Sequence, residues 1–263
     1  MKQMLRCQIK YNKPVADNIF LLGVKAGQKL KPVPGQFFMV RVRDGDHPLL
    51  NRPLDWFRYF PQKGLLEFVY QVVGTGTEIL SRRRPGEELT IIGPLGHGFD
   101  LKNFTGSALL IAGGVGMPGL WDFCLQHSRK RSCQLTLIWG AKSRKNFFLL
   151  DQLPKGIEFL PVTEDGSFGK KGLATEAADK FIQSRGAPNQ ILACGPRPML
   201  KATAAIAHGY GVRGQALYTE IMGCGTGACL GCAVPAAGGG YLHACSDGPA
   251  FFFDQIDWEK VRW

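Results

Sequence analysis

The sequence lacks long apolar runs, internal repeats and low-complexity segments. A helix that spans a membrane needs about 20 consecutive apolar residues, and the longest run here, around residues 108–112, suits only a buried strand. The absence of a repeat excludes a solenoid. We therefore expect no membrane span, and a chain of 263 residues that forms two compact domains and a small appendage.

Acidic residues are few relative to basic ones. The chain carries 21 Asp and Glu against 32 Lys and Arg, which gives a net charge of +11. Nucleic-acid-binding proteins combine such charge with interleaved aromatic residues or a known motif, and neither is evident, so we expect no nucleic-acid partner. An acidic protein or a phosphorylated ligand would suit the charge equally well. A solvated surface also explains the basic runs at 82–84, 129–131 and 142–145.

Cysteine is too sparse for a disulfide-rich scaffold, with eight in the chain, so we expect a reduced, cytoplasmic protein. Four of the eight nevertheless gather in the last quarter of the sequence: Cys224, Cys229, Cys232 and Cys245. The spacing C-x4-C-x2-C, with a fourth cysteine after a longer gap, is the plant-type [2Fe–2S] pattern. Glycines between them permit tight turns and let N–H groups approach sulfur. A structural zinc site remains an alternative, although such sites usually show two C-x2-C pairs.

The chain divides into three stretches of different pattern. Residues 1–103 hold short apolar segments separated by glycine and proline, which predicts a small antiparallel β-barrel. Residues 104–215 alternate strand and helix patterns, which predicts an α/β domain with a parallel sheet. Residues 216–263 hold the four cysteines and form a small C-terminal domain. The expected strands are 18–24, 36–42, 65–73, 88–92, 108–112, 134–139, 158–162 and 190–193, and the expected helices are 118–127, 174–183 and 198–208.

Two glycine-containing turns in the second stretch could bind a dinucleotide. The first, with Gly113, Gly114 and Gly116, joins a strand to a helix, where N–H groups and the helix dipole favour phosphate. Packing alone would explain these glycines equally well. The second turn, Cys194-Gly195-Pro196, ends a strand and taken alone is only a tight turn.

Polar groups in the first stretch could bind a pyrophosphate. An arginine pairs with phosphate oxygens, and a Gly-Thr turn offers N–H and hydroxyl donors. Taken one at a time, strand ends and a hairpin turn would explain each motif. The candidate residues are Arg52, Pro53, Leu54, Asp55, Val69, Tyr70, Gln71, Gly76 and Thr77.

Together and in this order, the motifs resemble those of the ferredoxin reductase superfamily. The segments 93–100, 163–172, 220–232 and 245–251 more closely resemble the electron transfer subunits of class 1B dihydroorotate dehydrogenases. The resemblance implies that the nine barrel residues bind FAD, and that the glycines and Pro196 bind NAD. It also implies that Cys194 lies in the nicotinamide pocket and that the four clustered cysteines ligate the [2Fe–2S] centre.

The resemblance also implies a function. An FMN-containing catalytic subunit would oxidise dihydroorotate in pyrimidine biosynthesis. This chain would relay the electrons through the [2Fe–2S] cluster and FAD to NAD+, in a heterotetramer with two copies of each subunit. The aromatic residues of the tail would provide material for the partner surface: Phe251, Phe252, Phe253, Trp258 and Trp263.

Two departures and two alternatives stay open. Asp55 stands where the family usually has Ser or Thr, whose hydroxyl can donate to flavin N5. Ser143 and Arg144 lie where NADP-binding members hold the 2′-phosphate, although the closer resemblance favours NAD. The same chemistry would serve a ferredoxin:NADP oxidoreductase or a sulfide dehydrogenase. A zinc-binding scaffold would require the flavin and nicotinamide motifs to be coincidental.

Overall fold

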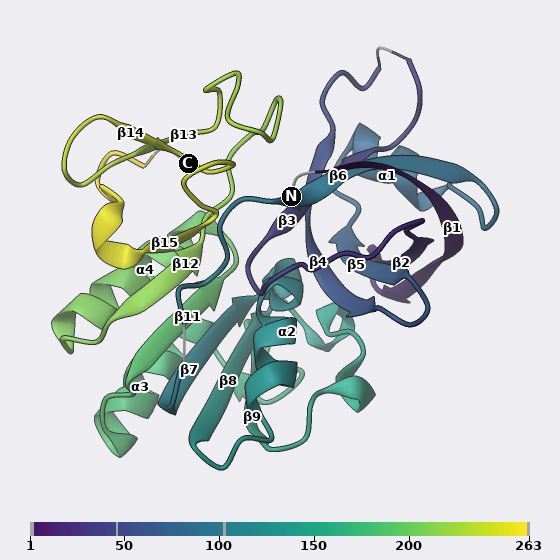
Figure 1. Ribbon diagram of the computed structural model, residues 1–263. Coiled ribbons are helices and arrows are strands. Elements are labelled where there is room, and N and C mark those ends of the chain that lie inside the picture. Colours follow the sequence, from purple (N-terminus) through teal and green to yellow (C-terminus); the bar gives the residue numbers. More distant parts are fainter. Residues whose placement is uncertain (1–2, 46, 102–103, 262–263) are drawn as a thin grey trace.

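The computed structural model describes residues 3–45, 47–101 and 104–261. A β-barrel, an α/β sheet and a C-terminal region adjoin one another in it (Figure 1). Residue 103, where we expected a domain boundary, and Trp263 lie outside the described residues. Within the described residues, no helix has the length and apolar character to cross a membrane.

The first stretch forms a closed barrel of six strands in the order β1-β2-β5-β4-β3-β6, and all its pairings are antiparallel. Alternation decides which side chains enter the barrel: in β1, Leu5, Cys7 and Ile9 are buried and the residues between them are exposed. A short helix, α1 (Thr75–Ser81), follows β5. The strands are β1 (Gln3–Ala16), β2 (Ile19–Lys25), β3 (Phe37–Arg41), β4 (Arg52–Phe60), β5 (Leu65–Gln71) and β6 (Glu88–Leu95).

The second stretch builds a sheet in the order β10-β9-β8-β7-β11-β12, in which every pairing is parallel. This confirms the predicted fold class of barrel, parallel sheet and C-terminal region. The strand order reverses between β7 and β11, and open α/β sheets bind ligands at such a point. The strands are β7 (Gly106–Gly113), β8 (Cys133–Ala141), β9 (Ile157–Thr163), β10 (Lys170–Lys171), β11 (Gln190–Cys194) and β12 (Gly214–Leu217).

Helices cover both faces of the sheet. Leu109 and Ile111 of β7 pack on the side of α3 (Ala174–Arg185) and α4 (Arg197–Gly209), whereas Leu110 packs on the side of α2 (Met117–His127). Because both faces are buried, the central strands are apolar throughout, as parallel strands usually are.

The C-terminal region is joined to this sheet. The strands β13 (Ala233–Pro235) and β14 (Tyr241–His243) form a hairpin, and β15 (Ala250–Phe252) pairs antiparallel with β12. Phe251 and Phe253 are buried in the core. These two residues of the aromatic tail therefore belong to the core beside the edge of the sheet and are not available to a partner surface.

Aromatic packing fixes the barrel against the sheet. Phe57 of β4 is fully buried, with its ring centroid 4.5 Å from that of Trp121 on α2 and 6.5 Å from that of Phe148. A polar link lies close by. Arg58 pairs with the buried Glu67 at 2.5 Å and donates to Gln152 of the second domain at 2.7 Å.

We predict that Phe57→Ala lowers the free energy of unfolding by about 3–5 kcal/mol, because it opens a cavity between two rigid units. Urea unfolding followed by fluorescence measures the effect. The matched control is Leu173→Ala at a half-exposed site (51 % exposed), which should change stability by less than about 0.5 kcal/mol. Equal stability of the two variants would contradict this account of the interface.

Candidate functional site

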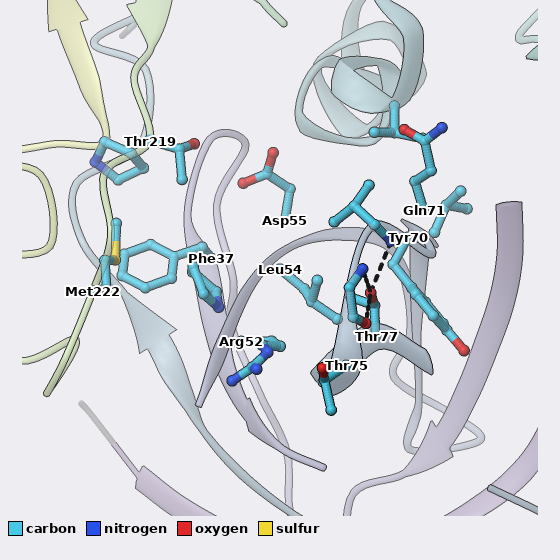
Figure 2. Close-up of a pocket in the computed structure, with 17 residues that line it drawn as sticks. Phe37, Arg52, Leu54, Asp55, Tyr70, Gln71, Thr75, Thr77, Thr219 and Met222 are labelled. Atoms are coloured by element: carbon cyan, nitrogen blue, oxygen red, sulfur yellow. Dashed lines mark hydrogen bonds between the residues drawn. The ribbon is translucent and has the colours of Figure 1, made fainter. Parts of the chain in front are cut away.

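A cavity of about 440 Å³ lies where the barrel, the sheet and the C-terminal region meet. Figure 2 shows its lining side chains, with Arg52 and Asp55 on the same strand. All nine barrel residues that we predicted to bind FAD line this one cavity: Arg52, Pro53, Leu54, Asp55, Val69, Tyr70, Gln71, Gly76 and Thr77. Residues from β4, from β5 and from the start of α1 thus converge on one space, as the sequence motifs indicated.

Backbone geometry explains why Arg52 and Gly76 occur together. A Cβ at position 76 would lie 2.0 Å from Arg52 Nε, so only glycine lets the guanidinium lie against the first turn of α1. Thr77, which lines the cavity, also makes hydrogen bonds within its own turn. Its Oγ1 accepts from the N–H of Val73 at 2.9 Å and donates to the carbonyl of Gly74 at 3.0 Å. The hydroxyl therefore holds the turn that shapes the cavity.

Part of the lining comes from outside the barrel, and the sequence motifs did not identify it. These residues include Val115, Thr219, Met222 and Pro249, and strand β3 of the barrel adds Phe37, which we also did not predict. Val115 sits inside the glycine-rich turn, and Met222 lies two residues before Cys224. The proximity of each of these to a predicted motif was the available signal, but only the fold shows that they face one cavity.

Asp55 meets the second domain at the edge of this cavity. Its Oδ2 lies 3.7 Å from Cys194 Sγ, which donates to it. Gly119 of α2 packs against both groups, since a Cβ there would lie 3.1 Å from Asp55 Oδ2 and 3.2 Å from the sulfur. Burial raises the pKa of Asp55 to about 6, although the thiol hydrogen bond opposes the rise. Asp55 therefore takes up a proton as the pH falls through 6.

The two glycine-containing turns of the second domain lie against each other at the switch point of the sheet. A Cβ at Gly116 would come within 2.1 Å of the carbonyl oxygen of Cys194, and one at Gly195 would come within 3.0 Å of Gly113. Gly114 has a φ of 53°. Close packing between the backbones thus requires the glycines, and it opens the carboxyl ends of β7 and β11 to a ligand. Pro196 begins the approach to α4 beside Gly113.

In the loop after β8, Ser143 contacts its own loop and Arg144 contacts the turn that follows β9. Ser143 donates from its N–H and its hydroxyl to Asn146 Oδ1 at 3.1 and 3.2 Å. The Arg144 N–H donates to Ser167 Oγ at 2.8 Å, and its guanidinium lies 4.5 Å from the centre of the Phe168 ring. These contacts order the loop at the sheet edge where a dinucleotide ribose is expected.

Backbone N–H groups connect the four clustered cysteines two by two. Cys229 N–H donates to Cys224 Sγ at 3.4 Å, and Cys245 N–H donates to Cys232 Sγ at 3.4 Å. Among the described residues, no three His, Cys, Asp or Glu side chains surround a single point as one metal ion would require. Gly225, with a φ of 70°, passes so close to Met39 that a Cβ would lie 2.4 Å from its side chain. The loop thus needs glycine to reach the barrel.

Hydrogen bonds favour the thiolate form of Cys224, the first of these cysteines. Burial raises the pKa of Cys224, but N–H donors from Thr226 and Cys229 outweigh it and lower the pKa to about 5. Burial raises the pKa of Cys245 to about 12, and its contact with Cys232 adds to the rise. Metal ligation requires thiolate sulfur, and the loop favours this charged form at Cys224, the first of the four predicted ligands.

A second cavity of about 450 Å³ adjoins the first on the outer surface. It lies between residues 47–53 and 220–222, next to the cysteine loop. Two apolar side chains that line it are unusually exposed: Leu49 is 81 % exposed and Ile221 73 %. Clustered exposure of this kind is typical of protein–protein contact surfaces.

Family models match two parts of the chain. Residues 219–257 match the iron–sulfur cluster binding domain of dihydroorotate dehydrogenase B. Residues 110–205 match the oxidoreductase NAD-binding domain. The first model covers the paired cysteines, and the second covers the glycine-rich turn and Cys194.

Solved structures share the fold over most of the chain. One, from a study of flavin-based electron bifurcation in NADH-dependent reduced ferredoxin-NADP oxidoreductase, has a TM-score of 0.84 and 28 % identity over 97 % of this chain and 91 % of that one. A ferredoxin reductase of carbazole 1,9a-dioxygenase shares the fold, with a TM-score of 0.71 and 18 % identity over 80 % of this chain and 67 % of that one.

Curated relatives match over most of their own length. The dihydroorotate dehydrogenase B (NAD+) electron transfer subunit of Desulforamulus reducens is 36 % identical over 86 % of this chain and 87 % of the relative. The protein of the same name from Fusobacterium nucleatum is 31 % identical over 96 % of this chain and 98 % of the relative. The chain therefore belongs to the family of dihydroorotate dehydrogenase B electron transfer subunits.

Proposed function

We propose that this chain relays electrons from a catalytic partner, through a [2Fe–2S] cluster and FAD, to NAD+. One observation carries the proposal: a single cavity is lined by the barrel, by the glycine-rich turn at Val115 and by Met222 at the start of the cysteine loop. Electron transfer requires cofactors to lie close together, and this cavity adjoins both of the other two candidate sites. FAD, [2Fe–2S] and NAD are the cofactors of an oxidoreductase subunit in this family.

The residues around the central cavity fit FAD. Arg52 offers a positive charge to a pyrophosphate. The backbone of the turn 74–77 lies directly beside the Arg52 guanidinium, because Gly76 has no side chain. Apolar side chains such as Leu54 and Val69 supply flat contact area for a ring system. When bound, a flavin can exchange electrons singly with a metal cluster and in pairs with a nicotinamide.

The cysteine pairs fit a two-iron cluster. Each iron of a [2Fe–2S] centre takes two thiolates. The N–H of Cys229 donates to Cys224 Sγ and the N–H of Cys245 donates to Cys232 Sγ, so these cysteines lie close together, and we propose all four as the cluster ligands. The zinc alternative would need all four sulfurs around one ion.

The proposal that the second domain binds NAD depends on the strand order of its sheet. Gly113, Gly114, Gly116, Gly195 and Pro196 lie at its switch point, where the positive ends of helix dipoles favour a pyrophosphate. Cys194, at the end of β11, is placed between this point and the flavin cavity. We propose NAD rather than NADP, because Ser143 is engaged by Asn146 and the Arg144 guanidinium lies over the Phe168 ring.

The partner we propose is an FMN-containing catalytic subunit that oxidises dihydroorotate, in a cytoplasmic heterotetramer with two copies of each chain. Exposed Leu49 and Ile221, beside the cysteine loop, offer it an apolar surface. Cys229 is itself exposed, so a partner seated there would lie against the cluster.

A second candidate shares the chemistry and changes the partner. The similarity to a structure from the ferredoxin-NADP oxidoreductase study favours a role as the small subunit of such a complex. The identity of the large subunit that co-purifies with the chain distinguishes the two candidates, since only one contains a dihydroorotate site.

Cluster ligation is tested by Cys229→Ser. We expect the EPR signal of the reduced cluster to be lost or strongly altered, because serine oxygen replaces one thiolate. Cys133→Ser, at a cysteine outside the four, should leave the signal unchanged. Zinc without iron in the native protein would contradict the assignment.

Flavin binding is tested by Arg52→Ala. A charge-assisted hydrogen bond contributes about 1.5–3 kcal/mol, so affinity for FAD should fall roughly ten- to a hundredfold. Fluorescence titration of the apoprotein measures it. Arg82→Ala, at an exposed arginine paired with Glu78, should bind FAD normally. Unchanged affinity in Arg52→Ala would overturn the placement.

Partner docking is tested by Ile221→Asp, which puts a charge into the apolar surface. We expect loss of co-purification with the catalytic subunit, while the isolated variant still passes electrons from NADH to artificial acceptors. Leu173→Asp, at another exposed apolar residue, should retain the complex. Dihydroorotate oxidation by the chain alone, free of a second polypeptide, would refute the proposed division of labour.

A further inference from the structure

The electron relay proposed above leaves one proton unassigned. Two electrons that arrive through an iron–sulfur cluster bring no proton with them. Reduction of NAD+ to NADH consumes two electrons and one proton, the proton ending in a new C–H bond of the nicotinamide. For every NADH formed, one proton must therefore be delivered at the flavin cavity. In the opposite direction, one proton is left there.

We propose that Asp55, with the Cys194 thiol beside it, is the group that holds and delivers this proton. Asp55 lines the flavin cavity, and its carboxyl touches Cys194 at the end of β11. It thus lies at the junction between the flavin cavity and the nicotinamide domain. This inference rests on the proposed function.

The contact has the chemistry that a proton store needs. When Asp55 gives up its proton, the O–H bond breaks and a carboxylate remains. The Cys194 thiol, whose Sγ lies 3.7 Å from Oδ2, donates a hydrogen bond to that carboxylate. Asp55 is partly exposed and Cys194 is buried, so of the two groups Asp55 is the one that can exchange its proton with its surroundings.

The surroundings of Asp55 hold its pKa within the range that proton transfer needs. Burial raises the pKa of Asp55 to about 6, and the thiol hydrogen bond holds it from rising further. A ligand in the cavity removes more water from the carboxyl, which raises its pKa again. Proton transfer is most efficient when the pKa lies near the operating pH.

The groups that face Asp55 are largely uncharged. Phe37 pairs with it from β3, Gly119 meets it from α2, and Cys194 meets it from β11. Arg52, on the same strand, lines the same cavity and carries the positive charge. Asp122 of α2 has its carboxylate engaged by Gln126 at 2.6 Å.

Asp122 provides a matched control. Burial also raises its pKa to about 6, yet it does not line the cavity. The test is the midpoint potential of bound FAD in the holoprotein, measured by anaerobic equilibrium titration across the pH range in which Asp55 titrates. We expect a change of slope with pH in the wild type and in Asp122→Asn, and its loss in Asp55→Asn.

Cys194 is tested as a positioning residue in the same titration. Cys194→Ala removes the thiol donor that stabilises the carboxylate, so the change of slope should move to higher pH. Cys194→Ser keeps a donor and should leave it near the wild-type pH. This pair of variants decides the question even if Asp55→Asn fails to retain FAD.

Infrared difference spectra supply a second readout. Reduced-minus-oxidised spectra of the wild type should show the carbonyl band of a protonated carboxylic acid, and Cys194→Ala should shift it. An unchanged slope pattern in Asp55→Asn, or no such band in the wild type, would overturn the proposal while the electron relay stands. Failure of the wild type to bind FAD would overturn both.

Discussion

The packing of β4 against α2 is the contact on which the rest of the molecule depends. Phe57 and Asp55, two residues apart on β4, both meet α2 or its surroundings. Phe57 packs against Trp121, and Asp55 meets Gly119 and Cys194. The aromatic contact holds the barrel against the sheet, and the polar contact lies between the flavin cavity and the end of β11. A shift of either domain would separate the flavin cavity from the end of β11, so the geometry of hydride exchange depends on this interface.

The C-terminal region depends on contacts with the rest of the molecule. An iron–sulfur loop rich in glycine has little core of its own, so it needs support from larger units. Here β15 extends the parallel sheet, Phe251 fills the core behind Cys232 and Cys245, and Gly225 lies against Met39 of the barrel. The cysteine loop is thus held by both of the other units, with its exposed side at Cys229 and Leu230. Such an arrangement suits a subunit that must pass electrons outward.

Much of this organisation could be predicted from the sequence. Motifs with local geometry, such as the cysteine spacing and the turn at Gly113, depend on a few consecutive residues and predict their structure well. All nine barrel residues chosen from the Arg52 and Thr77 motifs face one cavity. The turn around Thr77 was predicted in place but not in detail, because its hydroxyl binds Gly74 within the turn.

Contacts between residues far apart in the chain could not be predicted from the sequence. Nothing local to Asp55 indicates that Cys194, 139 residues later, would touch it, or that this contact would leave the carboxyl with a raised pKa. The burial of Phe251 also depends on an edge of the sheet that forms far away in the sequence. Contributions of Val115 and Met222 to the flavin cavity arise in the same way.

In the proposed relay, one chain connects a two-electron nicotinamide to a one-electron cluster through the cavity beside Arg52 and Asp55. Its most direct test is anaerobic addition of NADH to the purified chain, loaded with FAD and iron and free of any partner. Absorbance follows the flavin and EPR follows the cluster at successive times. We predict that FAD is reduced first and that the cluster signal then appears at the expense of reduced flavin. A cluster that stays oxidised under excess NADH, with the flavin fully reduced, would contradict the account.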